Sequence, residues 1–368
     1  MRVLLLDQYR DVGGAQTVLL QVLGCLVSRG FEVAAAIPIG GGLEATIRER
    51  FGEGVELIAI PELALTPRHK SSRDAVRLAG YSAGLLRLAP SLRRFHYVYV
   101  HGPRLFPAFA GLSSLISARY VYHVHLEHSR LEKSIIRGLL WHPRTHAVIA
   151  PSEFVMRGLG SRANRGRLRL VENALSETMS ALPFVDRWAD AERLDLVAVG
   201  RLIPEKGQDV VLDLAANFGR HRFHLIGCAD PARPEYAAAL RRRATPNVVF
   251  HGQVGDVAST IHQIGAQVCL VPSRRDESFG LAAIEGMACS CLTVTSGRGG
   301  LGNIAERTGA WTARTAEEWR AAIERIEGSA PDEMAHAARE QHDRTLDCYG
   351  FERFARDVAE IFSSETAR

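Results

Sequence analysis

Short apolar runs alternate with helical patterns along most of this chain. Residues 3–7 read VLLLD, and this apolar continuity predicts a strand buried on both faces. Over residues 15–29 apolar pairs recur every four positions, which is a helical period. Similar apolar runs predict further strands at 32–37, 55–60, 97–101, 120–125 and 146–150, and then at 194–199, 221–226, 248–251, 267–271 and 292–295. Such alternation predicts parallel sheets with helices on both faces.

The alternation pauses once, between two blocks of strands. Residues 174–193 have no clear period and contain Pro183, Trp188 and scattered charges, a pattern typical of a linker. We therefore predict an α/β protein with two Rossmann-like parallel-sheet domains that face a cleft. The expected domains are 1–173 and 194–349. Residues 350–368 follow, with apolar positions at 351, 354, 355, 358, 361 and 362 that predict a docked amphipathic helix.

The composition is that of an ordinary globular protein. Hydrophobic residues make up 46% and charged residues 23% of 368, which excludes wholesale disorder and favours two domains. No apolar run reaches the roughly 18 residues of a membrane-spanning helix. The apolar stretch near the N-terminus is too short for a secretory signal, so we expect a cytoplasmic protein. Six cysteines show neither a Cys-x-x-Cys pair nor zinc spacing, which favours free thiols.

The net charge of +4 conceals two halves of opposite sign. Residues 1–173 carry 23 Lys and Arg against 13 Asp and Glu, whereas residues 174–368 carry 22 against 28. Much of the positive excess lies in residues 68–94. One interpretation is a solvated surface, with the leucines at 85, 86 and 88 facing the sheet. The other is that Arg68, Lys70, Arg73 and Arg77 lie beside exposed leucines at 85, 86 and 88. Such a patch would meet an acidic or lipid-linked acceptor, or the inner face of the membrane.

Loops after the strands are where a parallel sheet binds ligands. The dinucleotide fingerprint and the Gly-x-x-x-x-Gly-Lys phosphate loop are absent, which disfavours a dehydrogenase or a P-loop ATPase. After the strand at 194–199, the segment 200–207 places Arg201 and Lys206 between two glycines. Two cations there suit a pyrophosphate. The alternative is an ordinary surface loop, although Lys206 is one of only three lysines in the chain.

A second polar loop, residues 272–280, follows the strand at 267–271. We expect a helix to begin near Ser278 or Phe279, so that the first free N–H groups form an anion site. Glu285 then lies on an otherwise apolar helix, where its carboxylate needs a partner, and ligand hydroxyls would serve. Glu277 lies in the loop that faces the same cleft. The alternative is that Glu285 pairs with an arginine.

These loops resemble those of the retaining GT-B-fold glycosyltransferases of group 1 (family 4). The segment from Gly200-Arg201 to Lys206-Gly207 is similar to the family's arginine–lysine loop. Glu277 and Glu285 match its Glu-x7-Glu motif, and Gly13-Gly14 matches its N-terminal glycine loop. The chain departs from the family at Asn173-Ala174 and at Ser290-Cys291-Leu292, where turns rather than chemistry are affected.

The resemblance implies a metal-independent transfer of a sugar to a hydroxyl acceptor, with retention and without a cofactor. The donor would be a nucleoside-diphosphate sugar, with UDP or GDP the expected nucleotide. Arg201 and Lys206 would hold the diphosphate, Glu285 the ribose and Glu277 the donor sugar. The backbone at Phe279, Gly280 and Leu281 would contact the sugar and phosphate, and Gly13 and Gly14 would keep the first loop close. Residues 1–173 would form the acceptor domain and residues 194–349 the nucleotide-sugar donor domain, and the C-terminal helix would pack back on the N-terminal domain.

The family also places a histidine beside the reacting sugar, at the end of an N-terminal-domain strand. Here His123 and His125 fall on the same face, so periodicity does not choose between them. We favour His125 because it is nearer the loop. His101 ends the preceding strand and is expected not to touch the sugar, and His128 is a loop alternative.

Two other classes of function remain open. One is a sugar-nucleotide epimerase or a phosphorylase on the same scaffold, and the other is a non-catalytic nucleotide-sugar-binding protein. Nucleic acid is not an expected partner, because the basic run at 241–243 has no stacking aromatic residues nearby. The sequence leaves the donor sugar, the acceptor and the oligomeric state undetermined.

Overall fold

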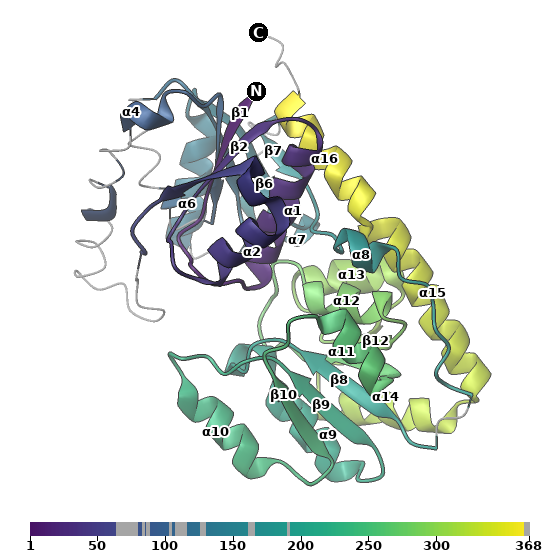
Figure 1. Ribbon diagram of the computed structural model, residues 1–368. Coiled ribbons are helices and arrows are strands. Elements are labelled where there is room, and N and C mark those ends of the chain that lie inside the picture. The colour runs from purple at the N-terminus through teal and green to yellow at the C-terminus, as the bar shows by residue number, and fades with distance from the viewer. Residues whose placement is uncertain are drawn as a thin grey trace. The chain divides into compact units, whose positions relative to one another are not determined.

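The protein consists of two compact α/β units (Figure 1). The computed structural model describes residues 1–63, 80–82, 85, 89–102, 105–106, 116–125, 130–160, 166–189 and 192–363. The first unit is Met1–Glu172 together with the chain from Arg353 onward, and the second is Asn173–Glu352. Each unit is built on a parallel sheet, which confirms the predicted fold class.

The first unit contains a seven-stranded sheet in the order β3-β2-β1-β4-β5-β6-β7. Its strands are β1 (Arg2–Leu6), β2 (Glu32–Ile37), β3 (Val55–Ala59), β4 (Tyr97–His101), β5 (Arg119–His123), β6 (Thr145–Ala150) and β7 (Leu168–Leu170). Its helices include α1 (Gly14–Ser28), α2 (Gly42–Phe51), α4 (Ala89–Leu92), α6 (Arg130–Trp141) and α7 (Glu153–Leu159), with a 3₁₀ turn at Gly52–Gly54. Residues 3–6 and 97–101 are fully buried, because both faces of the central strands are covered.

The C-terminal helix α16 (Phe351–Ser363) packs on the first unit, as the resemblance implied. Its apolar side chains face inward, and the ring of Phe362 meets those of Phe31 and Tyr97 edge-on, with centroids 6.3 and 5.4 Å away. The backbone oxygen of Ile361 accepts a hydrogen bond of 2.7 Å from His146 Nε2 on β6. These contacts tie the end of the chain to the sheet formed by its beginning.

The second unit contains a six-stranded parallel sheet in the order β10-β9-β8-β11-β12-β13. The strands are β8 (Asp195–Val199), β9 (Arg222–Ile226), β10 (Val248–Gly252), β11 (Val268–Val271), β12 (Leu292–Thr295) and β13 (Trp311–Thr312). The helices are α8 (Glu177–Ser180), α9 (Gln208–Asn217), α10 (Pro234–Arg243), α11 (Val257–Ile264), α12 (Leu281–Ala288), α13 (Gly300–Thr308), α14 (Ala316–Gly328) and α15 (Pro331–Tyr349). Strand order reverses between β8 and β11, which is where parallel sheets bind ligands.

The segment that reads as a linker packs on the second unit. Leu175 and Trp188 are buried in its cores, and Leu175 N donates to the backbone oxygen of Tyr349. Hydrophobic burial therefore fixes this segment although its sequence has no period.

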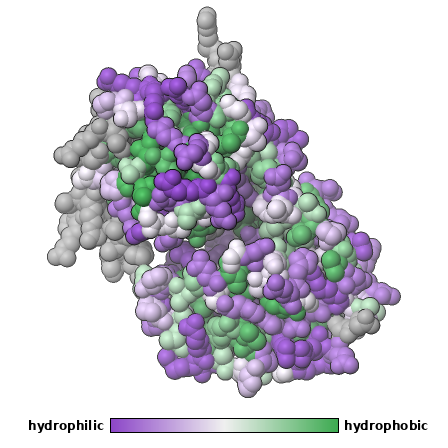
Figure 2. Space-filling model, viewed as in Figure 1, coloured by the Kyte–Doolittle hydropathy of each residue, from purple (hydrophilic) through white to green (hydrophobic). Residues whose placement is uncertain are grey.

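The surface of both units is mainly hydrophilic in the view of Figure 2, with smaller hydrophobic patches. Leu85 is buried in the core of the first unit, so the expectation that it is exposed beside the basic residues is wrong. Leu86, Leu88 and the basic residues Arg68, Lys70, Arg73, Arg77 and Arg87 lie outside the described residues, as does His128. All six cysteines are free. Among the described helices, none has the length and apolarity needed to cross a membrane.

Candidate active site

The loop after β8 carries Arg201 and Lys206, as the sequence predicts. It ends in a short 3₁₀ turn, Pro204–Lys206, followed by Gly207 as the N-cap of α9. Gly207 has φ +70°, and a Cβ there would lie 2.0 Å from the backbone oxygen of Pro272, so only glycine fits. Gln208 Nε2 donates to the backbone oxygen of Arg201 at 2.7 Å. The loop is therefore held rigidly against the loop that follows β11.

The side chain of Arg201 is exposed and makes no ion pair with another described residue. Lys206, in contrast, reaches across to the second loop. Its Nζ donates to Glu277 Oε1 at 2.8 Å, and its side chain is 33% exposed. An ammonium has three donors, so two remain for a ligand. The loop thus presents two cations, one on a partly buried and one on an exposed side chain.

Glu277 is held by two donors on the same oxygen. Lys206 Nζ and Ser273 Oγ both bond to Oε1, which leaves Oε2 to accept from a ligand. Burial by itself would raise the pKa of this carboxyl, but the charge and hydrogen bond of Lys206 and the Ser273 hydroxyl outweigh it and lower the pKa. Glu277 is therefore an ionised acceptor of fixed orientation.

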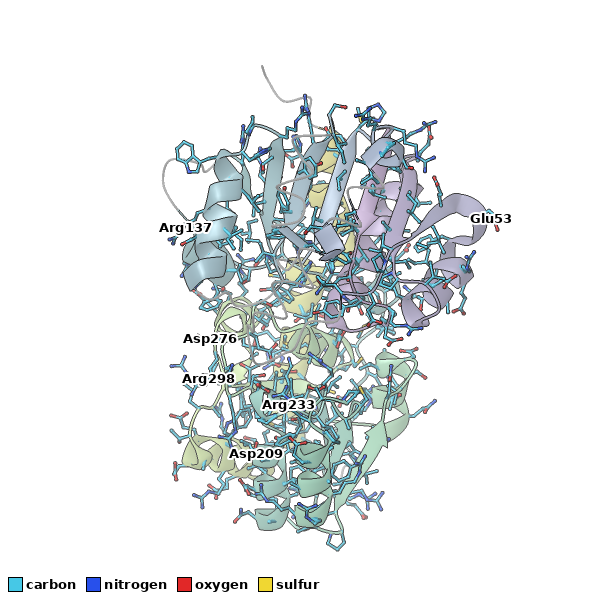
Figure 3. All side chains as sticks on the ribbon, turned by 90° about the vertical axis from the view of Figure 1, so that its left-hand side faces the viewer. Glu53, Arg137, Asp209, Arg233, Asp276 and Arg298 are labelled. Atoms are coloured by element: carbon cyan, nitrogen blue, oxygen red, sulfur yellow. The ribbon has the colours of Figure 1, made fainter. Side chains whose placement is uncertain are left out.

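The loop that contains Glu277 is braced by the loop after β12. Glu277 forms a parallel bridge with Gly299, and Gly300 N donates to the Glu277 backbone oxygen at 2.7 Å. A Cβ at Gly299 would lie 2.4 Å from that same oxygen. The charged residues of these two loops include Asp276 and Arg298, which are labelled in Figure 3. Contacts between residues some 20 positions apart therefore place the carboxylate.

Helix α12 begins later than the sequence predicts. Its first residue is Leu281 and its N-cap is Gly280, at φ +117°, so the prediction of a start at Ser278 or Phe279 is wrong. Phe279 is buried against Tyr349, with ring centroids 5.4 Å apart, and this packing keeps residues 278–280 out of the helix. The first free N–H groups of the helix consequently begin at Leu281.

Glu285 lies on α12 beside the same cluster. No hydrogen bond or ion pair joins its carboxylate to another residue in the described part of the chain, so the alternative of an arginine partner is not seen. Burial raises the pKa of Glu285 to about 7, and the positive charge of Lys206 opposes the rise only in part. Lys206 thus acts electrostatically on both Glu277 and Glu285, which places the three groups in one site.

In the first unit, the loop after β1 leads into α1 through Gly13. Gly13 is the N-cap, and its N–H donates to Gln16 Oε1 at 3.2 Å. Gln16 Nε2 in turn donates to Asp7 Oδ2 at 3.0 Å. Asp7 is fully buried at the end of the strand, and burial raises its pKa to about 6, opposed by the hydrogen bonds from Gln16 and the nearby backbone. This network fixes the N-terminus of α1, where Gly14 is the first helical residue.

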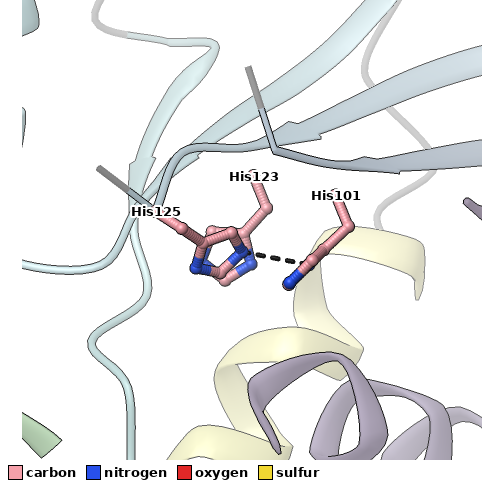
Figure 4. A group of neighbouring side chains, drawn as sticks. All are labelled: His101, His123 and His125. Carbon is pink, nitrogen blue, oxygen red and sulfur yellow. Dashed lines mark hydrogen bonds between the residues drawn. The ribbon is translucent and has the colours of Figure 1, made fainter. Parts of the chain in front are cut away.

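Three histidines meet beside this loop (Figure 4). His101 ends β4, His123 ends β5, and His125 follows two residues later, so the strand at 120–125 is shorter than predicted. The ring of His125 lies 3.9 Å from the rings of both other histidines, measured between centroids. Side-chain alternation correctly places His123 and His125 on one face. His101, which was expected not to touch the sugar itself, is in direct contact with His125.

The hydrogen bonds of His101 determine the tautomer of His125. His101 Nε2 lies 2.9 Å from the backbone oxygen of Ala15, which can only accept, so this nitrogen carries the proton. Burial lowers the pKa of His101 to about 3, so the ring is neutral and its Nδ1 is an acceptor. His125 Nε2, 3.0 Å from that Nδ1, must therefore donate. The first turn of α1 thereby orients His125 through His101.

The three imidazoles could in principle hold a transition metal, because one nitrogen of each lies within 4.8 Å of the others. Their geometry does not fit. Around a zinc ion bound at about 2.0–2.1 Å, imidazole rings point outward and their centroids are roughly 5 Å apart. Here the rings are tilted at 44° and 41° with centroids at 3.9 Å, and both nitrogens of His101 are engaged in hydrogen bonds.

Sequence reasoning did not select Asp7, Gln16 or Ser273. Each is polar, buried and next to a predicted loop. Asp7 could have been found from its position, because it is a polar residue that ends the apolar first strand. Ser273 and Gln16 act through other side chains, so only the folded loops identify their roles.

Comparisons with known proteins give consistent matches. The family profile described as "Glycosyltransferase Family 4" matches residues 12–178, and the profile described as "Glycosyl transferases group 1" matches residues 193–328. The uncharacterized glycosyltransferase MJ1178 of Methanocaldococcus jannaschii is 33% identical over 107 residues, which is 29% of each chain.

Solved structures also match over nearly the whole length, and two of them illustrate this. Anabaena Alr3699/HepE in complex with UDP and glucose has a TM-score of 0.81 at 18% identity, covering 99% of this chain and 100% of the other. Sucrose-phosphate synthase from Thermosynechococcus elongatus has a TM-score of 0.79 at 19% identity and 98% coverage of both chains. At this identity the structural match establishes the arrangement of elements.

Proposed function

This chain belongs to the group 1 (family 4) glycosyltransferases, retaining enzymes of the GT-B fold that use nucleoside-diphosphate sugars, and we propose that it transfers the sugar to a hydroxyl acceptor without a metal ion. The main support for this proposal is the group formed by Lys206, Glu277 and Glu285. It combines a cation, an ionised acceptor and a carboxylate of raised pKa at the point where strand order reverses.

Lys206 and Arg201 stabilise the departing diphosphate in this proposal. Glycosyl transfer develops negative charge on the leaving group, and fixed cations lower the barrier most when they are already oriented. Lys206 is pre-oriented by Glu277 and retains two donors for phosphate oxygens. Arg201 supplies a second charge from the same loop. The free N–H groups from Leu281 onward, together with the backbone at Phe279 and Gly280, add donors at the helix N-terminus.

The two carboxylates hold the donor at either end. Glu277 accepts hydrogen bonds from the transferring sugar through Oε2, since Oε1 is occupied by Lys206 and Ser273. Glu285 accepts from the ribose hydroxyls. Glu277 is ionised, but its charge is compensated by the ammonium of Lys206, so the carboxylate is a poor nucleophile. This supports attack of the acceptor on the face from which the diphosphate leaves.

The first unit contributes His125 beside the reacting sugar and the glycine loop at Gly13 and Gly14 near the phosphates. We favour His125 over His123 because it lies nearer the loop and keeps 8% exposure, whereas His123 is completely buried. A UDP-sugar is the first donor to test, since Alr3699/HepE was solved with UDP and glucose.

The acceptor is proposed to be acidic or lipid-linked, with the enzyme acting in the cytoplasm at the inner face of the membrane. The support is the positive charge of residues 1–173. An acceptor KM that rises with salt would agree, and a KM that ignores ionic strength would contradict this part alone.

The test is incubation of the purified chain with UDP- and GDP-sugars, with and without an acceptor pool and in the presence of EDTA. Release of nucleoside diphosphate with an α-linked product from an α-linked donor supports the proposal. Conversion between nucleotide sugars without release indicates an epimerase, and saturable binding without turnover indicates a binding protein. Loss of activity with EDTA would refute the metal-independent mechanism.

A further inference from the structure

Three neighbouring strands of the first unit are each entered through an arginine. Arg119 begins β5, Arg144 directly precedes β6, and Arg167 directly precedes β7. The strands are parallel neighbours, so their amino-terminal ends share one edge of the sheet. That edge is opposite the carboxyl ends, from which the glycine loop and His125 arise. Arg169 on β7 adds a fourth guanidinium.

These arginines line one groove of about 720 Å³ between the sheet and α16. The acidic residues of the groove are Asp357 and Glu360 on α16, and Asp357 is already paired with Arg353 at 2.9 Å. Positive charge therefore exceeds negative charge. No residue of this groove belongs to the proposed active site.

The charges of several of these guanidinium groups reach the same side chain in the groove. His146, which also lines the groove, has a lowered pKa mainly because of burial, and the charges of Arg119, Arg169 and Arg167 lower it further against the bond to Ile361. Arg167 is committed in part to the backbone oxygens of Leu140 and His142. Arg144 and Arg169 form no side-chain ion pair with any residue that the structure describes.

Arg144 and Arg169 lie in one groove and carry no ion pair among the described residues. Guanidinium groups in this state are well suited to recognise phosphate oxygens, because they offer several donors in a planar fork.

We propose that this groove is a second anion site, which binds a phosphate group through Arg144 and Arg169. The phosphate belongs either to a soluble phosphorylated ligand or to a phospholipid headgroup. The site is independent of sugar transfer. It lies at the amino-terminal ends of the strands, opposite His125 and the glycine loop, and it shares no residue with the loops of the second unit that would bind the donor.

The test measures phosphate binding in a chain whose donor loop is disabled. All proteins carry Arg201→Ala and Lys206→Ala, so that the loop cations do not contribute. Titration calorimetry with sodium phosphate, against sodium chloride of equal ionic strength, is compared between this background and Arg144→Ala/Arg169→Ala. The matched control is Arg50→Ala/Arg137→Ala, which removes two exposed arginines of the same unit outside the groove; Arg137 is labelled in Figure 3.

We expect saturable binding in the background and in the control, and at least tenfold weaker binding in the groove variant. Glu360→Gln should tighten binding, a gain that misfolding does not produce. Co-sedimentation with phosphatidylglycerol vesicles, against phosphatidylcholine vesicles, separates the two sources. Arginine-dependent vesicle binding identifies a headgroup, and arginine-dependent phosphate binding alone identifies a soluble ligand. If neither depends on Arg144 and Arg169, the proposal is overturned.

Discussion

Lys206 has two roles that substitution should separate. It neutralises Glu277, and in the proposed mechanism it also offsets charge on the diphosphate. We predict that Lys206→Ala and Arg201→Ala each remain folded and lose at least about a hundredfold in kcat, equivalent to about 2–4 kcal/mol of transition-state stabilisation. Steady-state kinetics and circular dichroism measure both effects, with Arg242→Ala on α10 as the control. Near-normal turnover in either folded variant would remove that residue from the mechanism.

Glu285 should make donor binding depend on pH. Its pKa is about 7, so the carboxylate is mostly protonated at pH 6 and mostly ionised at pH 8. If ionised Glu285 accepts from the ribose, the donor KM of the wild type should fall up to about tenfold over this interval. Glu285→Gln should raise the KM and show no such dependence, whereas Glu277→Gln should mainly lower kcat. An unchanged KM in Glu285→Gln would show that the carboxylate is structural.

The same pKa has an opposite consequence for stability. A carboxyl whose folded pKa lies above its unfolded pKa favours the folded state while it is protonated, and this contribution is lost as pH rises through 7. Glu285→Gln should therefore raise the melting temperature at pH 8 more than at pH 5. Thermal unfolding at the two pH values is the measurement.

His101 should affect turnover without touching the sugar. Its Nδ1 accepts from His125 Nε2, and the loss of one such bond is worth about 1 kcal/mol. We predict that His101→Leu lowers kcat roughly five- to tenfold with little change in the donor KM. His101→Asn, which keeps an acceptor near the same position, should recover much of the loss. Equal activity of the two variants would show that the contact is only packing.

Residue identities were more predictable than residue partners. Arg201, Lys206, Glu277 and Glu285 could be chosen because their types and spacing suit a nucleotide sugar. The roles of Ser273 and His101 could not, because each depends on an atom of a residue brought near only by folding.

At the scale of elements, the apolar runs located every central strand to within two residues. The short edge strands β7 and β13 were missed, because strands of three and two residues leave no periodic signal. The start of α12 was misplaced for another reason. Ser278 has the side chain of a cap, but packing of Phe279 and the positive φ of Gly280 override that preference.

The joint between the loops after β8 and β11 should be intolerant of a single methyl group. Gly207→Ala would combine a left-handed backbone with a contact of 2.0 Å to the Pro272 oxygen. We predict a loss of at least about 2 kcal/mol in the free energy of unfolding, together with reduced turnover. Gly219→Ala, where no atom lies within 4 Å of the new Cβ, is the matched control and should be nearly neutral. Denaturant unfolding of both variants tests the difference.

At the scale of the whole molecule, the second unit is one continuous segment, Asn173–Glu352, with its own sheet and cores. We predict that this segment expressed alone unfolds cooperatively and binds the nucleoside diphosphate, and that Lys206→Ala weakens this binding. Circular dichroism and titration calorimetry are sufficient. A segment without cooperative unfolding would show that the second unit requires the rest of the chain.

The first unit is made of two pieces, and the junction between them is closed by a hydrogen bond: Arg353 Nη2 donates to the backbone oxygen of Glu172 at 3.0 Å. The chain therefore leaves the first unit and re-enters it at neighbouring points, so the second unit is an insertion in the first. Exchanging the whole insert between relatives would need only these two splice points. With the donor bound by the second unit, as proposed, and the acceptor by the first, as expected from the resemblance, such an exchange would transfer donor choice without acceptor choice.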